Sequence, residues 1–370
     1  MKKNNQKISI ISPSLNGGGA EKVAVNLANY YSSIGHEVDL VLFKKKGSYL
    51  SFVHSGVNII DLNTSRSRYV IFKLRKYLKD NTNSCILSVI RDVNILIGIS
   101  AYGLKIEYIT YREASTLSGM KKLPFFQKLI YKYLMKISYL KAKNLIANSY
   151  DTKIDLLSEK IIKEDKIKVI GNPVLPLDYK ELLDKECTNK WLLNKNYKTV
   201  VSVGRLHKLK DFTFLIECFV EVVKKINNAR LVIIGEGSEK AKLQKKIEEL
   251  NLNSFVQIEE FQENIFPFYH EATLFALSSQ WEGFGNVLVE ALSAGTSVVS
   301  TNCPGGPKMI LEDGKYGKLV ELNNKKAYIE TLIFELEKEN ISEKKEELIE
   351  YAKKFSVQTI GDKYLDYIIN

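Results

Sequence analysis

The chain has 370 residues, of which 45% are hydrophobic and 26% charged, and these ordinary proportions exclude a disordered, collagen-like or low-complexity protein. Its formal net charge of +11 indicates an anionic partner: nucleic acid, a phosphorylated ligand or a membrane surface. The four scattered cysteines and four histidines form neither a zinc-binding nor a disulfide pattern, so we expect a reducing, cytosolic location. We also expect no secretory signal and no bilayer-spanning helix, because the apolar runs are short or interrupted by polar residues.

The first part of the chain alternates strand and helix patterns. A β-branched run at 7–11 is followed by a glycine loop, a helical pattern at 20–34 and a second strand at 36–43. This order is the opening of a βαβ unit. Further strands are predicted at 57–62, 86–89, 106–111 and 144–148, with helical patterns between them. Continuous apolar strands alternating with helices predict a parallel sheet that is covered on both faces.

A second alternation begins after a stiff segment, because Pro173 and Pro176 predict an extended linker. The strands predicted after it are 200–204, 230–235, 255–258, 272–277 and 297–300, and the helices are 212–225, 239–250 and 286–294. We therefore predict the α/β class, with two Rossmann-like, doubly wound domains at 1–172 and 173–355. The cleft between two such domains is the expected ligand site. A C-terminal helix at about 356–370 is expected to pack back onto the first domain.

Two loops that follow predicted strands could bind an anion. Gly17, Gly18 and Gly19 precede the first helix, where backbone N–H groups could face phosphate, although a tight turn is the alternative. Arg205 and Lys210 follow the first strand of the second half. An arginine fork with a lysine point charge suits a diphosphate, although a solvated basic loop is the alternative.

A third loop is the most specific feature of the sequence. Glu282 lies in a glycine loop and Glu290 lies eight residues later, two turns into the following helix. The first carboxylate could contact a reacting sugar and the second could accept hydrogen bonds from a ribose diol. The helix N-terminus at 286–288 could face phosphate oxygens. The alternative is that both are ordinary surface acids. A further glycine loop at 303–307 also follows a predicted strand.

With these loops in view, the chain resembles the family 4 retaining glycosyltransferases, which have the GT-B fold of two Rossmann-like domains. The resemblance is strong over 200–320 and weak over 45–140, and the motifs that carry it are GRLHKLKD (204–211), VIIGEGSEKAKL (232–243), WEGFGNVLVEALSAGTSVVST (281–301) and GGPKMILEDGKYGKLV (305–320).

The resemblance implies a role for each matching residue. Arg205 and Lys210 would bind the donor diphosphate and, with Glu282 against the donor sugar, form the catalytic set. Glu290 would hold the ribose, and the segment 261–265 would flank the nucleotide base. Loop and helix contacts to the donor would come from Gly18, Gly19, Phe284, Gly285, Asn286, Val287 and Leu288.

Two departures from the family pattern are visible. Many members have a histidine near the transferred sugar, after a strand of the first domain, where this chain has Arg112 and Glu113. Either could contact the acceptor or the sugar. Many members also have a glutamate where this chain has Met309.

The positive charge is concentrated in the first half. Residues 1–172 hold 28 basic and 13 acidic residues (+15), and residues 173–370 hold 26 and 30 (−4). No acid occurs between Glu113 and Asp151, and lysines in that interval are spaced as on one helix face. The expected membrane-contacting residues are Lys121, Lys122, Phe125, Phe126, Lys128, Lys132 and Lys136. A basic helix with aromatic residues is typical of a membrane-surface element, although a solvated helix is the alternative.

We therefore predict a retaining, metal-independent glycosyltransferase that needs no cofactor beyond a nucleotide sugar, with UDP the expected nucleotide. It would transfer a hexose or N-acetylhexosamine to a lipid-linked glycan of a capsule, O-antigen or glycoprotein pathway. It would act at the inner face of the cytoplasmic membrane, on an anionic surface, without binding nucleic acid. The alternatives are a GT-B enzyme acting on a soluble sugar or sugar phosphate, and a non-catalytic binding subunit.

Overall fold

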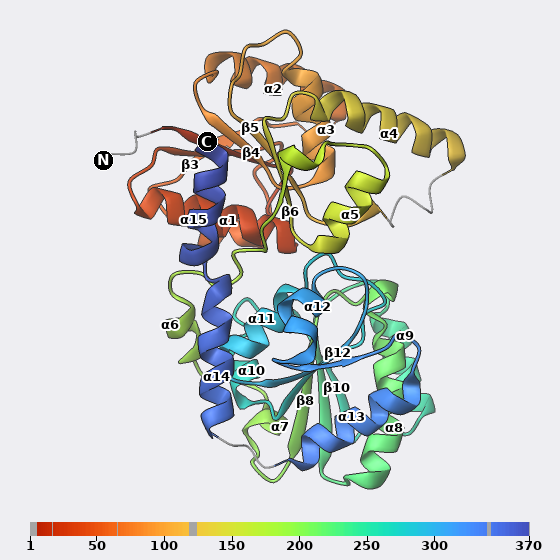
Figure 1. Ribbon diagram of the computed structural model, residues 1–370. Helices are drawn as coiled ribbons and strands as arrows, with labels where there is room; N and C mark the ends of the chain where they lie inside the picture. The colour runs from red at the N-terminus through yellow and green to blue at the C-terminus, as the bar shows by residue number, and fades with distance from the viewer. Residues whose placement is uncertain (1–5, 17, 65, 118–123, 339–341, 370) are drawn as a thin grey trace. The chain divides into compact units, whose positions relative to one another are not determined.

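The computed structural model describes residues 6–16, 18–64, 66–117, 124–338 and 342–369. The chain forms two compact units (Figure 1). Unit 1 comprises Met1–Leu177 with Phe355–Asn370, and unit 2 comprises Asp178–Lys354. The segment with Pro173 and Pro176 belongs to unit 1, and the chain passes to unit 2 after Leu177.

Unit 1 is built on a seven-stranded parallel sheet with the strand order β3-β2-β1-β4-β5-β6-β7. The order reverses next to β1, which is the doubly wound pattern predicted from the sequence. The strands are β1 (Ile8–Ser12), β2 (Val38–Leu42), β3 (Asn58–Asp61), β4 (Cys85–Ser88), β5 (Ile109–Glu113), β6 (Asn144–Ala147) and β7 (Ile167–Val169). Its central strands are buried on both faces, which explains their continuous apolar sequences.

Helices cover both faces of this sheet. The helices of unit 1 are α1 (Gly19–Ser33), α2 (Ser67–Asp80), α3 (Arg91–Ser100), α4 (Phe125–Tyr139), α5 (Tyr150–Ser158) and α15 (Val357–Ile369). One core contains side chains of α2, α3, α4 and α5, and the other contains side chains of α1 and α15. Figure 1 shows α2, α3 and α4 together on one side of the sheet.

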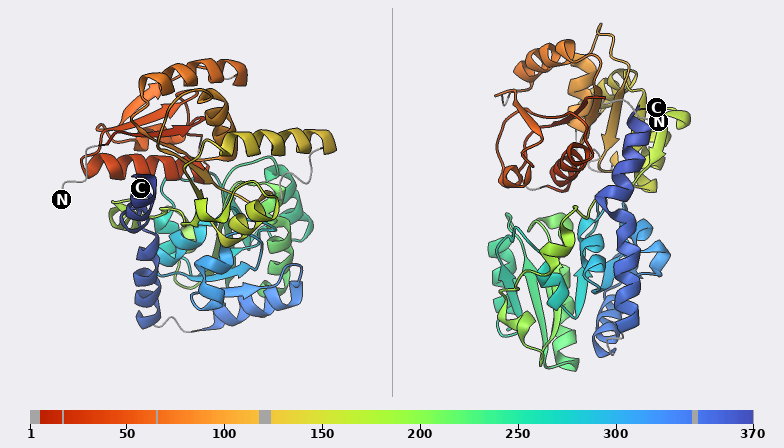
Figure 2. Two further views of the ribbon diagram at one scale, coloured as in Figure 1. Left: turned by 45° about the horizontal axis from the view of Figure 1, so that its top comes forward. Right: turned by 90° about the vertical axis from the view of Figure 1, so that its left-hand side faces the viewer.

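The last helix, α15, lies beside the first helix, α1, in unit 1 (Figure 2). The Tyr31 hydroxyl donates to the Gly361 carbonyl at 3.0 Å, and the Tyr30 hydroxyl donates to Asp362 at 2.6 Å. A side chain at Gly361 would collide with the Tyr30 ring, so glycine permits this close approach. Within unit 1, Leu175 and Ser356 also form a parallel β-bridge. The C-terminal segment is thus an integral part of unit 1.

Unit 2 has a six-stranded parallel sheet with the order β10-β9-β8-β11-β12-β13. Its strands are β8 (Lys198–Val203), β9 (Ala229–Ile234), β10 (Val256–Glu259), β11 (Leu274–Leu277), β12 (Ser297–Thr301) and β13 (Lys318–Val320). Its helices are α6 (Tyr179–Leu183), α7 (Lys190–Leu193), α8 (Phe212–Lys225), α9 (Lys240–Glu249), α10 (Phe266–Glu271), α11 (Asn286–Ser293), α12 (Pro307–Ile310), α13 (Lys325–Glu337) and α14 (Ser342–Ala352). The order reverses between β8 and β11, where parallel sheets of this kind bind ligands at their carboxyl edge.

The sequence predicted this parallel α/β organisation correctly but missed two edge strands, β7 and β13. Each has three residues and includes exposed positions, Lys168 and Lys318. So short a run carries too little hydrophobic periodicity to predict a strand.

Candidate active site

Lys210 and Glu282 form the centre of the site in unit 2. Lys210 ends a 3-10 turn (Lys208–Lys210) after β8, and Glu282 lies in the loop after β11. The Lys210 Nζ lies 2.6 Å from the Glu282 Oε1, and both side chains are largely buried. The Ser279 hydroxyl donates to the same carboxylate oxygen at 2.6 Å. Neighbouring central strands thus bring a cation, a carboxylate and a hydroxyl together at the carboxyl edge of the sheet.

Gly204 leaves room for the Lys210 side chain. A Cβ at Gly204 would lie 3.3 Å from Cε and 3.5 Å from Cδ of Lys210, so the lysine stem runs closely past this glycine. Asp211 then adopts the left-handed conformation (φ 47°) and accepts a hydrogen bond from the Phe214 N–H, capping α8. The turn before α8 therefore aims Lys210 back across the strand end.

Hydrogen bonds connect this turn to the loop after β11. The Ser278 hydroxyl donates to the Lys210 carbonyl at 2.8 Å, and the Gln280 side chain donates to Asp211 at 2.7 Å. From β12, the Thr301 hydroxyl donates to the Ser279 carbonyl at 2.6 Å. The position of Glu282 is therefore determined by contacts from three strand ends.

The glycine loop at 303–307 supports Glu282 through its backbone. Gly305 has a φ of +123°, and a Cβ there would lie 2.0 Å from the Glu282 carbonyl oxygen. A Cβ at Gly306 would lie 1.9 Å from the Phe284 carbonyl oxygen. The Glu282 N–H donates to the Pro304 carbonyl at 3.0 Å. Two loops can pack backbone against backbone here only because these residues lack a side chain.

Cys303 lies close to the same carboxylate. Burial, together with the negative charge of Glu282, raises the pKa of the Cys303 thiol to about 12. The thiol is therefore protonated at neutral pH and packs as a small apolar group.

The helix after Glu282, α11, begins at Asn286, and Gly285 is its N-cap residue. The φ of Gly285 is +95°, in the left-handed region that favours glycine. The Leu288 N–H donates to the Gly285 carbonyl at 2.9 Å, so this N–H is bonded within the helix. Asn286 and Val287, which are half-buried, form the first turn. The helix N-terminus concentrates partial positive charge next to Glu282.

Glu290 lies further along α11 and is 4% exposed. The Tyr269 hydroxyl, from α10, donates to its Oε2 at 3.2 Å. Burial first, and then the charge of Glu290, raise the pKa of Tyr269 well above its ordinary value. Arg205 differs from these groups because it is exposed on the loop that follows β8.

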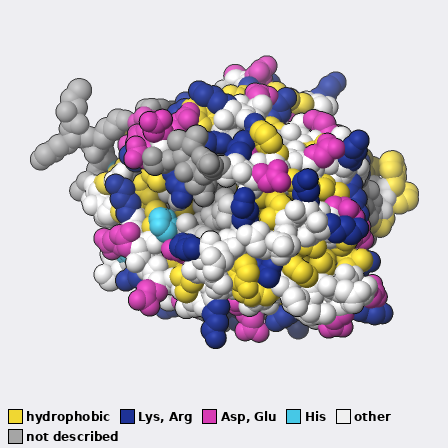
Figure 3. All heavy atoms as spheres, turned by 90° about the horizontal axis from the view of Figure 1, so that it is seen from below, with side chains coloured by type: hydrophobic (Ala, Val, Ile, Leu, Met, Phe, Trp, Pro, Cys, Tyr) yellow, Lys and Arg dark blue, Asp and Glu magenta, His cyan; other side chains and the backbone are white. Residues whose placement is uncertain are grey.

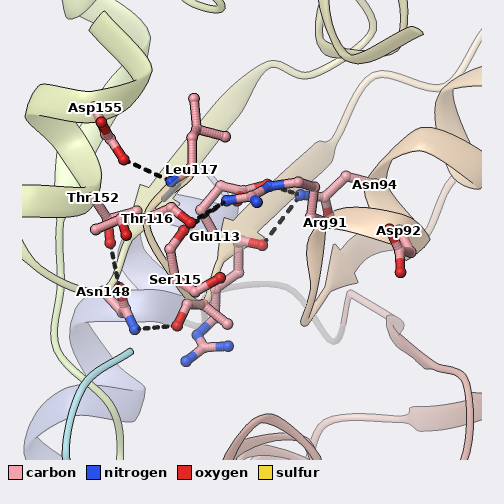
Figure 4. Close-up of polar contacts among 12 residues, drawn as sticks. Arg91, Asp92, Asn94, Glu113, Ser115, Thr116, Leu117, Asn148, Thr152 and Asp155 are labelled. Atoms are coloured by element: carbon pink, nitrogen blue, oxygen red, sulfur yellow. Dashed lines mark hydrogen bonds and ion pairs between the residues drawn. The ribbon is translucent and has the colours of Figure 1, made fainter. Parts of the chain in front are cut away.

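A second polar cluster lies at the end of β5 in unit 1, around Glu113 (Figure 4). The Arg91 guanidinium forms an ion pair with Glu113 at 2.7 Å. Asn94 donates to the other carboxylate oxygen at 2.9 Å, and the Tyr139 hydroxyl from α4 also donates to it. Burial opposes the charged form of Arg91, but Glu113 outweighs it and raises the pKa of the guanidinium. Glu113 itself is fully buried.

The same cluster fixes the loop that follows β5. Arg91 donates to the Ser115 carbonyl at 2.6 Å, and Asp155 from α5 accepts from the Leu117 N–H at 2.6 Å. Asn148 donates to the Ala114 carbonyl at 2.7 Å. Figure 4 shows these contacts converging on the loop from α3, α5 and the end of β6.

Comparison with known proteins identifies the family. A model described as "Glycosyl transferases group 1" matches residues 184–355, and one described as "Glycosyltransferase Family 4" matches residues 17–175. The chain is a family 4 glycosyltransferase with the GT-B fold.

Similar proteins support this assignment along the whole chain. Over 375 residues the chain is 28% identical to the N-acetylgalactosamine-N,N'-diacetylbacillosaminyl-diphospho-undecaprenol 4-alpha-N-acetylgalactosaminyltransferase of Campylobacter jejuni, covering 98% of this chain and 100% of that one. A second C. jejuni protein, an alpha-1,4-N-acetyl-D-galactosaminyltransferase acting on GalNAc-alpha-(1->4)-GalNAc-alpha-(1->3)-diNAcBac-PP-undecaprenol, is 26% identical, with 98% of each chain covered. Among solved structures, Anabaena Alr3699/HepE in complex with UDP-glucose is 19% identical, has a TM-score of 0.80, and covers 97% of this chain and 98% of that one.

The structure pairs Lys210 with Glu282, and it buries Glu290 in the helix that follows. The hydrogen bonds around these residues involve others that the sequence analysis did not single out, which are Ser278, Ser279, Gln280, Thr301 and Tyr269. Hydroxyl residues at the ends of adjacent strands were the available signal, but serine and threonine are too common there to be predictive.

The expected contact of Arg112 or Glu113 with the acceptor or the sugar is not supported by their positions. Arg112 is 1% exposed and donates to the Val89 carbonyl at 2.7 Å, to Asn172 at 2.5 Å and to Tyr364 at 3.1 Å. Glu113 is enclosed by its own cluster. Both side chains have interior partners, and the residues left at this strand end are those of the loop at 114–117.

The glycine loop before α1 is described from Gly18 onwards, and Gly17 lies outside the described residues. Gly18 is the N-cap residue of α1. The Glu21 carboxylate folds back over it, since a Cβ at Gly18 would lie 2.2 Å from the Glu21 Oε2. An anion that approached Gly18 and Gly19 would therefore have to displace this carboxylate.

Of the expected membrane residues, Lys121 and Lys122 lie outside the described residues, and the others lie on α4 or at its start. Among the described residues, no group of three or more His, Cys, Asp or Glu side chains is arranged to hold a metal ion. Within that same part of the chain, no helix combines the length and the apolar character needed to cross a membrane.

Proposed function

We propose that the protein transfers a hexose or N-acetylhexosamine from UDP to a lipid-linked glycan, with retention of anomeric configuration and without a metal. The observation that carries the proposal is the Lys210–Glu282–Ser279 cluster at the carboxyl edge of unit 2, followed by the buried Glu290. The two C. jejuni relatives, whose names specify undecaprenol-linked acceptors, support the acceptor class. The HepE complex with UDP-glucose supports the nucleotide.

In this proposal, Lys210 and the exposed Arg205 bind the donor diphosphate. As the bond between the sugar C1 and the diphosphate oxygen breaks, negative charge grows on the leaving group and these cations stabilise it. The N-terminus of α11 adds the partial positive charge of its first turn. The acceptor hydroxyl attacks C1 from the side on which the diphosphate leaves, and its proton passes to the departing phosphate oxygen.

The carboxylates would act on the donor rather than as a hydrolase pair. Glu290 would accept hydrogen bonds from the ribose hydroxyls, with Tyr269 fixing one of its oxygens. Glu282 would orient the sugar while holding Lys210 in place. The expected place of action is the cytoplasmic face of the membrane, where a lipid-linked acceptor meets a water-soluble donor.

The test is a panel of nucleotide sugars incubated with the purified protein and an undecaprenyl-diphosphate-linked glycan, with the anomeric configuration of the product read by NMR. We expect turnover with a UDP-sugar that continues in the presence of EDTA. Lys210→Ala should lower turnover on the order of 100-fold, as expected for the loss of one charge-stabilising donor. Lys208→Ala, an exposed change in the same turn, is the matched control and should leave turnover nearly unchanged.

Other outcomes would contradict parts of the proposal. Equal turnover of the two lysine variants would refute the role of Lys210. Transfer to a free sugar phosphate without lipid would favour a soluble acceptor. Binding of UDP without turnover of any donor in the panel would favour a non-catalytic subunit, and an inverted product or inhibition by EDTA would refute the mechanism.

A further inference from the structure

Helix α4 (Phe125–Tyr139) carries a continuous apolar surface that faces solvent. Its exposed large apolar side chains, together with the residue that follows the helix, are Phe125 (74%), Phe126 (76%), Leu129 (58%), Ile130 (60%), Tyr133 (64%), Ile137 (41%) and Leu140 (79%). At 3.6 residues per turn they fall within an arc of about 140°. A soluble helix normally turns such a face towards a core, so this face is suited to contact with another apolar phase.

The opposite side of α4 is firmly held in unit 1, so the exposure is not the result of a detached helix. Met135, Ser138 and Tyr139 are buried. Ser138 packs against α3 at Gly98, where a Cβ would lie 2.3 Å from the Ser138 Cβ. The Tyr131 hydroxyl donates to Asp92 on α3, and Tyr139 joins the Glu113 cluster. Figures 1 and 2 show α4 projecting from the other helices of unit 1.

Lysines border one edge of the apolar arc. Lys128, Lys132 and Lys136 follow one another at four-residue spacing, beside Phe125 and Leu129 on the helix surface. Lys132 is paired with Glu159 of α5. The hydrogen bond from Lys132 is the main cause of a lowered pKa of Glu159, and the charges of Lys128 and Lys136 add to it against the effect of burial. Lys128 and Lys136 thus contribute a positive field along this edge.

The apolar face of α4 together with its lysine border favours an anionic bilayer over a protein partner. An apolar stripe with a basic border matches acyl chains below a layer of lipid phosphates. Self-association through a two-fold axis would bring the same lysine-bordered surfaces of two copies together. Over much of the face drawn in Figure 3, by contrast, basic and acidic side chains are interspersed.

We propose that α4 lies in the headgroup region of an anionic bilayer, with Leu129, Ile130, Tyr133 and Ile137 inserted and Lys128 and Lys136 on lipid phosphates. The sequence already predicted membrane contact by lysines and by Phe125 and Phe126. The present proposal adds Leu129, Ile130, Tyr133 and Ile137 and makes insertion of the apolar face the main attachment. It concerns unit 1 alone and does not depend on the proposed chemistry of unit 2.

The test is sedimentation of the full chain with phosphatidylcholine vesicles that contain or lack phosphatidylglycerol, at low salt. Binding to the anionic vesicles is expected, and Leu129→Gln/Ile130→Gln should weaken it by about tenfold or more. Ile154→Gln on α5, a position 63% exposed in the same unit, is the matched control and should bind as the unmodified protein does. Lys128→Gln/Lys136→Gln should lose about fivefold per lysine on anionic vesicles and little on neutral ones.

A fluorescent reporter measures insertion directly. Both native tryptophans, Trp191 and Trp281, are in unit 2, so Tyr133→Trp adds one probe to unit 1. Brominated lipids should quench this added emission, whereas a tryptophan at Ile154 should stay unquenched. Absence of sedimentation at low salt, or equal binding of the α4 and α5 variants, would overturn the proposal. So would a dimer that Leu129→Gln/Ile130→Gln converts to a monomer without any vesicle binding. UDP binding to the same variants should be unchanged, which separates this proposal from the one for unit 2.

Discussion

Each unit places a carboxylate beside a cation at the carboxyl edge of its parallel sheet, but the surroundings of the two pairs differ. In unit 1, Glu113 is fully buried, the Arg91 side chain is 13% exposed, and Arg91 also donates to the Ser115 and Thr116 carbonyls of the loop at 114–117. In unit 2, Lys210 keeps 21% of its side chain exposed, and the exposed Arg205 lies on the same loop. A pair with a fully buried carboxylate and a cation that is also bonded to loop carbonyls maintains the fold, whereas a pair with a more exposed cation can exchange its partner for a ligand.

Replacing the glutamate of each pair by glutamine should give the largest contrast between the two units, in stability and in turnover. Glu113→Gln should lower the free energy of unfolding of unit 1 by about 3 kcal/mol, because it removes a fully buried carboxylate and leaves the largely enclosed Arg91 without a countercharge. Chemical unfolding followed by hydrogen exchange of β5 measures this loss. Tryptophan fluorescence, which comes only from unit 2, serves as the internal control and should change little. A stability loss no larger than that of Glu164→Gln, in an exposed ion pair with Lys153, would contradict the structural role.

Glu282→Gln should show the opposite pattern. Because the Lys210 side chain keeps 21% of its surface exposed, we expect a smaller loss of stability than in Glu113→Gln. Turnover of the donor should fall on the order of 100-fold, since the cation loses the group that positions it. Steady-state kinetics and thermal unfolding of the same preparation measure both effects, and a stable variant with normal turnover would refute the comparison.

Substitution of Glu290 tests whether donor binding and turnover depend on different residues of unit 2. Glu290→Gln should weaken UDP binding about tenfold, as expected for the loss of a charged hydrogen-bond acceptor. Tyr269→Phe removes only the hydroxyl that fixes the carboxylate and should have a smaller effect. Calorimetric titration with UDP measures both affinities. A larger loss of UDP affinity in Tyr269→Phe than in Glu290→Gln would contradict the role proposed for Glu290.

The smallest expected effect concerns the alkylation rate of the Cys303 thiol. With a pKa of about 12, the thiol should resist alkylation at neutral pH until unit 2 unfolds. Since Glu282 contributes to this raised pKa, Glu282→Gln should increase the alkylation rate only slightly, burial being the larger cause. Mass spectrometry of the Cys303 peptide gives the rate. Rapid labelling of the native protein would show that the thiol is more accessible than the structure indicates.

Much of the fold and part of the site followed from the sequence. The parallel sheets were predictable because buried central strands such as β1 and β8 have continuous apolar runs. Helix α8 was predicted with its observed limits, since the capping Asp211 and the basic residues at its end mark both termini. Glu282 and Lys210 were singled out because their motifs are specific, although their ion pair depends on strand order, which periodicity does not encode.

The roles of Arg112 and Glu113 could not be predicted in the same way. Their place after a strand suggested a ligand contact, but their partners Tyr364, Asn172 and Tyr139 come from distant parts of the chain. Burial of a charged residue depends on such long-range packing. On α4, Phe125 and Phe126 were expected to contact a membrane, but the rest of the exposed apolar face was not predicted, because an amphipathic pattern does not reveal which face meets the core.

The return of α15 to unit 1 has a consequence for how the protein is made. Unit 2 is continuous in sequence and all its residues leave the ribosome before Phe355 does. Unit 1 is discontinuous, and its core on the α1 side includes Ile360, Tyr364 and Ile368 from a segment that is synthesised after all of unit 2. Arg112 likewise gains the Tyr364 hydroxyl only then. During translation the first unit to begin folding is therefore the second to be completed, and the buried Arg112 lacks one of its hydrogen-bond partners until α15 has emerged.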